Sequence, residues 1–96
     1  MENEIDRRRS LEVAVGNLSG LRILGELMRT PSPPQTKYSL RRKTGLKATD
    51  VKKTLRRLVE SEWVSELNCV PKKYSPNLSR SEVKDLAAFL RRVGYI

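Results

Sequence analysis

Two short amphipathic segments flank Gly45, and this arrangement limits the folds open to the chain more than any other feature. The first segment, 39–44, has Leu40 as the residue expected to be buried. The second, 48–61, repeats apolar residues at helical spacing: Val51, Leu55, Leu58 and Val59. Glycine readily adopts the left-handed conformation that follows a helix. The pattern therefore predicts helices over 39–44 and 48–61, joined by a tight turn after which Leu46 returns to the core.

The chain before this pair has a helical pattern that ends at prolines. Apolar residues at three- and four-residue spacing predict an amphipathic helix over 11–28, open to a break at 16–17, where Asn17 would cap a second segment. Residues 31–34 read Pro-Ser-Pro-Pro, which favours an extended connector because proline cannot donate a backbone hydrogen bond. Residues 1–10 are polar and mixed in charge, so we expect a flexible arm there, or a frayed first helical turn.

The chain after the pair predicts a hairpin and one more helix. Residues 63–67 alternate apolar and polar side chains, as a half-buried strand does, and 72–75 reads as the returning strand. Ser79 and Glu82 have the spacing of a capping box, which predicts a last helix over 80–93. The expected fold class is mainly α with a small β-hairpin, that is, α+β.

Basic residues concentrate in the helix pair. Between Lys37 and Arg57 there are nine basic residues and one acidic residue, Asp50, which together account for +8 of the chain's formal charge of +9. A folded segment with this much like charge repels itself, and a partner dense in negative charge relieves the repulsion. Nucleic acid carries one phosphate charge per about 1.7 Å of duplex axis. The sequence therefore favours a nucleic-acid partner, with a membrane surface as the weaker candidate.

Composition excludes several other kinds of protein. Ninety-six residues are enough for one domain with one core. Cys69 is the single cysteine and histidine is absent, so we expect no disulfide, no metal site and no cofactor. We find no catalytic constellation, no pattern for a small-molecule ligand, and no signal peptide or membrane span. The expectation is a cytoplasmic, nucleoid-associated protein that is not an enzyme.

The stretch from Leu40 to Val64 resembles the helix-turn-helix of winged-helix transcription regulators, with the MarR and PadR groups the most similar. The resemblance rests on the turn glycine, Gly45, and on an apolar frame: Leu40, Leu46, Val51, Leu55, Leu58 and Val64. The run 72–74 resembles the strand that leaves the wing, and the resemblance covers about residues 18–92. It implies a single winged-helix domain over 11–96, with a helix-turn-helix at 38–61 and a wing at 63–75.

The chain departs from the family pattern at two positions. Family members tend to have glycine where Glu62 stands, just before the strand. They usually have a small residue where Arg41 stands, which lets the two helices approach closely. A wider crossing of the helices, or a shifted register of the short helix, would alter the role of Arg41 and Arg42.

The resemblance implies that the 48–61 helix enters the major groove, which is about 12 Å wide and admits one α-helix. It places the wing, 67–74, on the DNA backbone or in the minor groove. Thr49 is small enough to approach base edges, and arginine suits bidentate contact with guanine. The predicted DNA-binding residues are Lys37, Arg41, Arg42, Lys43, Lys47, Thr49, Lys52, Lys53, Arg56, Arg57, Lys72 and Lys73.

Other interpretations stay open for some of these residues. The basic side of the 48–61 helix can be a solvated surface, although glutamate partners four residues away are missing except for Glu60 after Arg56. Lys72 and Lys73 can equally protect the edge of a hairpin. Arg7 to Arg9 fit either a minor-groove arm or a disordered tail. Trp63 is expected in the core.

The apolar surfaces of the terminal helices favour a homodimer, because residues 83–96 and 11–18 show more apolar surface than a small core needs. The alternative is that both helices close the core of a monomer. We expect a dimeric, sequence-preferring transcriptional regulator of double-stranded DNA. One alternative is an architectural or partition-type protein that coats DNA, and a second is a winged-helix module for protein interaction.

Overall fold

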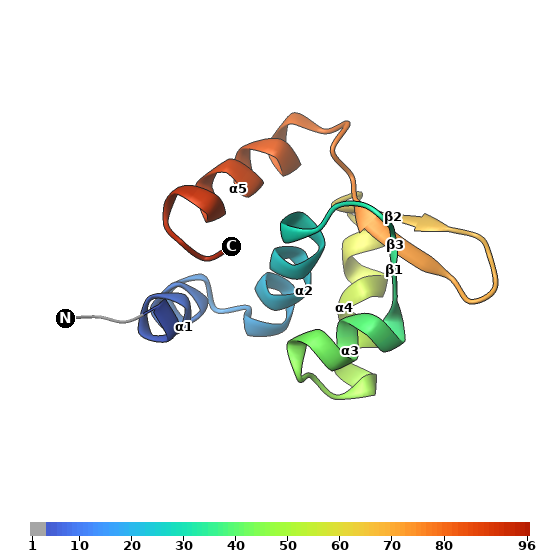
Figure 1. Ribbon diagram of the computed structural model, residues 1–96, viewed down its shortest axis with the longest axis horizontal. Helices are drawn as coiled ribbons and strands as arrows, with labels where there is room; N and C mark the ends of the chain where they lie inside the picture. Colours follow the sequence, from blue (N-terminus) through green and yellow to red (C-terminus); the bar gives the residue numbers. More distant parts are fainter. Residues whose placement is uncertain (1–3) are drawn as a thin grey trace.

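Helix α2 (Leu18–Arg29) is the element around which the rest of the chain packs. The computed structural model describes residues 4–96, with side chains from Arg8 onward. Before α2 comes α1 (Glu4–Val15); after it come β1 (Gln35–Thr36), α3 (Lys37–Thr44), α4 (Ala48–Glu60), β2 (Val64–Leu67), β3 (Lys73–Pro76) and α5 (Ser81–Arg92). Figure 1 shows α1 at one end of the long axis and the β2–β3 hairpin at the other.

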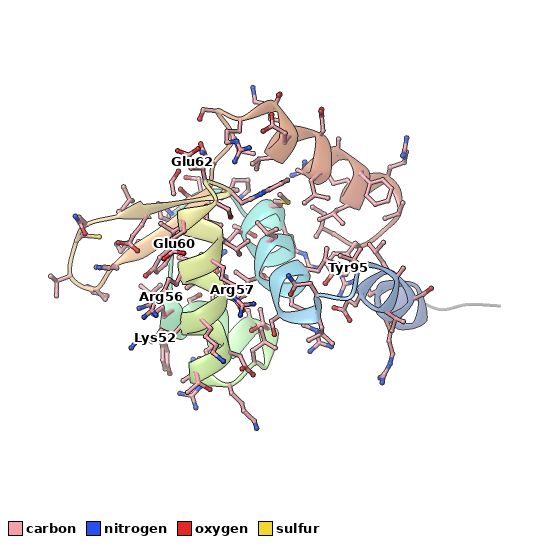
Figure 2. The ribbon with its side chains drawn as sticks, turned by 180° about the vertical axis from the view of Figure 1, so that it is seen from behind. Lys52, Arg56, Arg57, Glu60, Glu62 and Tyr95 are labelled. Atoms are coloured by element: carbon pink, nitrogen blue, oxygen red, sulfur yellow. The ribbon has the colours of Figure 1, made fainter. Side chains whose placement is uncertain are left out.

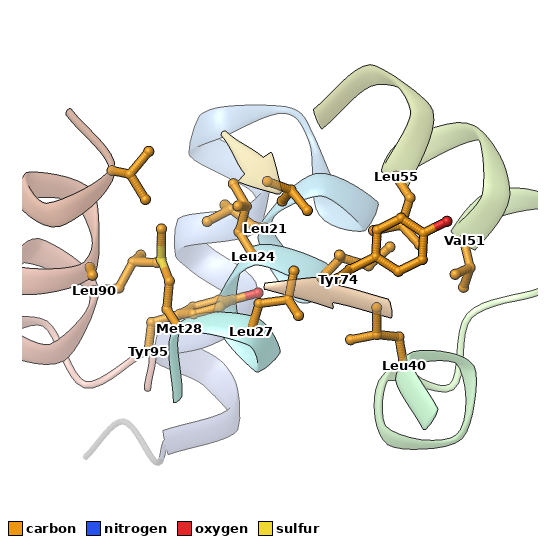
Figure 3. Packing of buried hydrophobic residues seen from close by; sticks show 14 residues of the cluster. Leu21, Leu24, Leu27, Met28, Leu40, Val51, Leu55, Tyr74, Leu90 and Tyr95 are labelled. Atoms are coloured by element: carbon orange, nitrogen blue, oxygen red, sulfur yellow. The ribbon is translucent and has the colours of Figure 1, made fainter. Parts of the chain in front are cut away.

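The core forms because α2 buries residues toward both of its neighbours. Leu27 and Met28 are almost inaccessible to solvent. Figure 3 shows these α2 side chains between Leu90 of α5 on one side and Leu40 and Leu55 of α3 and α4 on the other. Burying apolar surface of this kind contributes about 25 cal/mol per Å². All the core elements therefore depend on α2 for their relative positions.

The helix pair around Gly45 forms as predicted. Gly45 has φ 72°, in the left-handed region, and its N–H donates to the Arg41 carbonyl at 3.0 Å. Leu40 and Val51 are buried, and Leu46 packs against the core while half-buried. Since Leu40 faces inward and Arg41 outward, the short helix keeps the expected register.

The hairpin has a third strand that the sequence analysis missed. The antiparallel sheet has the order β1–β3–β2, with Val64 opposite Pro76 in the hairpin and Thr36 opposite Lys73 at the outer pair. Directly after the proline-rich connector 31–34, residues 35–36 are extended and join the sheet. This pairing ties the start of α3 to the hairpin.

Helix α1 begins earlier than the sequence predicted, whereas α2 begins at the predicted break. The expected break at 16–17 is present, and the Asn17 side chain caps α2 by accepting from the Gly20 N–H at 3.0 Å. Residues 4–10, expected in an arm, belong to α1. Residues 1–3 lie outside the described residues, and so does the side chain of Arg7. Arg9 is exposed on α1.

The capping box predicted before the last helix is wrong. The N-cap of α5 is Arg80, without a side-chain cap, and the Ser79 hydroxyl donates to Asn77 Oδ1 at 2.6 Å. Glu82 accepts instead from the Ser81 hydroxyl and from Arg80. These two hydrogen bonds, that from Ser81 first, lower the pKa of Glu82. The spacing was right, but the N-cap is Arg80, so the helix starts one residue later than a Ser79–Glu82 capping box requires.

Glu62 stands in the left-handed region, with φ 64°. It lies between α4 and β2, where the Trp63 N–H donates to the Leu58 carbonyl at 2.9 Å and Asn77 Nδ2 donates to the Glu62 carbonyl. A residue with a Cβ is strained in this conformation. The backbone at this position thus has a conformation that glycine adopts more readily than glutamate.

Trp63 is half-buried rather than fully enclosed. It packs against the core, as expected, and the Arg80 guanidinium lies over its ring at 5.7 Å from the centroid. Arg80 also donates to the Ser61 carbonyl at 2.7 Å. The indole therefore covers the junction between α4 and the sheet.

Candidate nucleic-acid interface

Helix α4 presents a row of cationic side chains to solvent. Val51 and Leu55 bury the opposite side of the helix, which turns Lys52, Lys53 and Arg56 outward. Figure 2 shows Lys52, Arg56 and Glu60 along one side of α4 and Arg57 on the other. The burial of one helical stripe therefore fixes where the charges point.

These α4 cations have no salt-bridge partner among the described residues. The ion pairs found among the described residues join other side chains: Arg22–Glu12, Arg29–Glu26, Lys72–Glu66 and Arg80–Glu82. Glu60 follows Arg56 by four residues and still does not pair with it. An unpaired basic surface keeps its full positive potential for a partner.

The start of α4 is open to an approaching anion. Lys47 is the N-cap, is exposed and makes no side-chain cap bond, and Thr49 in the first turn is exposed as well. The first backbone N–H groups of a helix lack partners within the helix and favour negative charge. Asp50 is the acidic residue in this turn. A phosphate near Lys47 would meet both a cation and these N–H groups.

Helix α3 adds a second basic surface beside α4. Lys37, Arg41 and Arg42 are exposed, and the Arg42 guanidinium lies over the Tyr38 ring at 5.8 Å. Tyr38 is itself 66% exposed. Stacking holds the guanidinium while its donors stay available.

Lys43 is exposed but committed to a local bond. Its ammonium donates to Gln35 Oε1 at 3.0 Å, and the buried Gln35 amide in turn donates to the Glu26 carbonyl at 3.4 Å. The Lys43 side chain is therefore held toward β1 and α2 and is not free to extend into solvent.

The hairpin carries the last two predicted residues. Lys72 pairs with Glu66 at 3.2 Å, and Lys73 is exposed on β3. Because Thr36 pairs with Lys73, the segment that begins α3 at Lys37 lies beside the hairpin. Strand β1, which sequence analysis missed, thus brings two predicted cations that are far apart in sequence, Lys37 and Lys73, close together.

All twelve predicted residues are solvent-exposed. The fold brings together most of those of α3, α4 and the hairpin. Arg57 lies on the other side of α4, and Lys43 and Lys72 are held by neighbours. A further basic group on α1 and α2 lines a pocket: Arg9, Arg22 and Arg29. Sequence analysis considered Arg9 only as part of an N-terminal arm or tail and gave no role to Arg22 and Arg29. The sequence signal for this group was weak, because it consisted only of the seven-residue spacing that puts Arg22 and Arg29 on one side of α2.

The chain matches no protein-family model, and no curated protein matches it. Among solved structures, it is similar to one described as the "predicted DNA-binding transcriptional regulator from E. coli". The two are 25% identical, the match covers 88% of this chain and 93% of that chain, and the TM-score is 0.63. Because the match covers most of both chains, the similarity extends over the whole arrangement of helices and sheet.

The fold is a winged helix. Helices α3 and α4 form the helix-turn-helix, and the β2–β3 hairpin forms the wing. This confirms the α+β fold class predicted from the sequence. Assignment to the MarR or PadR group stays a prediction. Among residues 4–96, no helix is long and apolar enough to cross a membrane.

Proposed function

We propose that this protein binds double-stranded DNA and regulates transcription, with α4 in the major groove. The observation that carries the proposal is the row of exposed, unpaired cations on α4. The similar E. coli protein, described as a DNA-binding transcriptional regulator, supports the same function. On this proposal the protein works beside the cell's DNA, in the cytoplasm.

The roles of the cations follow from their positions. Thr49 at the start of α4 reaches base edges, and Arg56 is placed for bidentate contact with guanine. Lys47, Lys52 and Lys53 neutralise phosphates, as do Lys37, Arg41 and Arg42 of α3. Lys73 on the wing reaches the adjacent backbone or minor groove. Arg57, on the other side of α4, approaches the far strand.

The protein acts as a homodimer on this proposal, with α1 and α5 supplying the contact. Val15 of α1 is 57% exposed and Phe89 of α5 is 37% exposed. Val83, Ala87 and Leu90 of α5 are buried within the chain. The apolar surface left for a partner is therefore smaller on α5 than the sequence suggests, and α1 carries more of it.

A DNA-coating role is the second candidate, favoured by the two lysines at 52–53, which suit backbone contact more than base reading. Footprinting on a duplex chosen by random-sequence selection separates the two roles. A discrete protected site supports a regulator, and protection that spreads along the duplex supports a coat.

A charge reversal on α4 tests the proposed DNA-binding mode. We expect Arg56→Glu to weaken binding to the selected duplex at least about tenfold, since an arginine–guanine contact contributes about 1–3 kcal/mol. The matched control is Lys84→Glu, which makes the same change in charge at an exposed residue of α5. Equal losses of affinity in the two variants would show that α4 does not enter the groove.

A further inference from the structure

A pocket of about 520 Å³ lies between α1, α2 and the end of α3. Arg8, Arg9 and Glu12 line it from α1, Arg22 and Arg29 from α2, and Lys43 from α3. The Tyr95 ring closes it near the C-terminus, beside α1 as Figure 2 shows. Pockets that hold small organic ligands have volumes of about 300–1,000 Å³. The pocket is therefore large enough for a ligand of that size.

The walls of this pocket carry more positive than negative charge. Five basic side chains line it, against the two carboxylates of Glu12 and Glu26. Both carboxylates are engaged within the protein: Glu12 Oε2 accepts from Arg22 Nε at 3.1 Å and from the Tyr95 hydroxyl at 2.8 Å, and Glu26 pairs with Arg29 at 3.3 Å. An anion entering the pocket thus meets a positive excess.

The cations that line the pocket remain accessible despite these bonds. The Arg22 and Arg29 side chains are each 41% exposed. Arg9 is exposed and forms no ion pair with any residue that the structure describes. Guanidinium groups present planar sets of donors that match phosphate oxygens. Four arginines around one pocket favour a phosphate group over a single carboxylate.

Apolar surface accompanies the charge. Val13 and Leu18 line the mouth of the pocket, and the Tyr95 ring lines its wall. Gly25 lets this ring pack closely on α2, because a Cβ at this position would lie 2.7 Å from the Tyr95 ring. A ligand that fits has a charged end and an apolar or ring-shaped body.

We propose that this pocket binds a small phosphate-bearing organic anion of nucleotide size. The site is separate from the α4 surface and goes beyond the proposed DNA binding. Its bound ligand contacts α1, α2 and the end of α3 together. The same arginines can also attract DNA phosphates, so the test has to separate the two sources of phosphate.

Isothermal titration calorimetry with ADP and with pyrophosphate, in magnesium-free buffer, tests the site. We expect ADP to bind with one-to-one stoichiometry, pyrophosphate to bind more weakly, and adenosine not to bind. Arg9→Glu should weaken ADP binding at least about tenfold, since hydrogen bonds to charged groups contribute about 1.5–3 kcal/mol. Lys84→Glu, with the same change in charge on α5, should bind ADP as the wild type does.

Three results would overturn the proposal. The first is that neither ADP nor pyrophosphate binds. The second is that citrate, a polyanion without phosphate, binds as tightly as ADP. The third is that Arg9→Glu weakens duplex binding as much as Arg56→Glu does, which would make the pocket part of the DNA surface. Circular dichroism checks that Arg9→Glu is folded, which we expect because Arg9 is exposed and forms no ion pair with a described residue.

Discussion

Glu62 shows how one residue can depart from the pattern of a fold while the fold is kept. Its φ is 64°, and the winged-helix regulators that the sequence resembles tend to have glycine at this position. The side chain makes no hydrogen bond or ion pair within the described residues, so removing it costs no contact. The family glycine is explained here by the turn, which requires the left-handed conformation whatever the side chain.

Replacing Glu62 with glycine should stabilise the protein. Relief of the left-handed strain outweighs the entropy lost by glycine on folding, for a net gain of about 0.5–1 kcal/mol. Urea unfolding followed by circular dichroism measures this change. The control is Lys53→Gly, at an exposed position inside α4, which should destabilise by a similar amount. A loss of stability in Glu62→Gly would contradict the strained conformation.

Tyr95 was expected only as apolar surface, and the structure gives its hydroxyl a role. The hydroxyl donates to the buried carboxylate of Glu12, which joins the C-terminal segment to α1. No periodicity predicts this bond, because 83 residues separate its partners. Tyr95→Phe should cost about 1–3 kcal/mol at neutral pH, because Glu12 loses a donor.

The pH dependence of stability tests the same bond. Burial, and then the hydrogen bond to Glu12, raise the pKa of Tyr95 above its ordinary value of 10. The unfolded chain therefore loses this proton first, and the contribution of Tyr95 to stability is lost as the pH rises above 10. Between about pH 9.5 and pH 11.5, the wild type should lose more stability than Tyr95→Phe. The control, Tyr38→Phe, should follow the wild type; identical slopes for wild type and Tyr95→Phe would refute this role.

At the scale of elements, helical periodicity predicted the features that depend on residues close together in the sequence. The helices 39–44 and 48–61 and the Asn17 cap were found because each depends on neighbours in sequence. The two-residue strand β1 was missed because it is too short for a pattern and forms by pairing with β3, 37 residues later in register. The start of α1 was missed because its first residues show no apolar stripe.

Helix α1 makes few core contacts, and of its two exposed valines, Val13 and Val15, the second is the element-level support for a dimer. The wild type should sediment at twice the chain mass of 11.0 kDa, and Val15→Glu should sediment as a monomer, because a buried unpaired charge disfavours the contact. Val70→Glu, at a fully exposed position on the wing, is the control that should stay dimeric. Analytical ultracentrifugation decides, and a monomeric wild type at tens of micromolar would end the dimer proposal.

At the scale of the whole molecule, the concentration of charge was visible in the sequence and its direction was not. The sequence places nine basic residues within 37–57, but their common exposure depends on α2 burying the other sides of α3 and α4. The pocket between α1 and α2 was also beyond prediction, since it depends on how distant segments pack. The candidate interface follows from charge, and the candidate pocket follows from tertiary structure.

The central claim is that these cations neutralise DNA phosphates on a rigid surface, and the salt dependence of duplex affinity tests it most directly. Fluorescence anisotropy over a series of salt concentrations gives the slope of log affinity against log salt. If each bound dimer neutralises about six to eight phosphates, the slope should be about −5 to −7 on B-form DNA. A slope near zero, or no binding to duplex at low salt, would contradict the account.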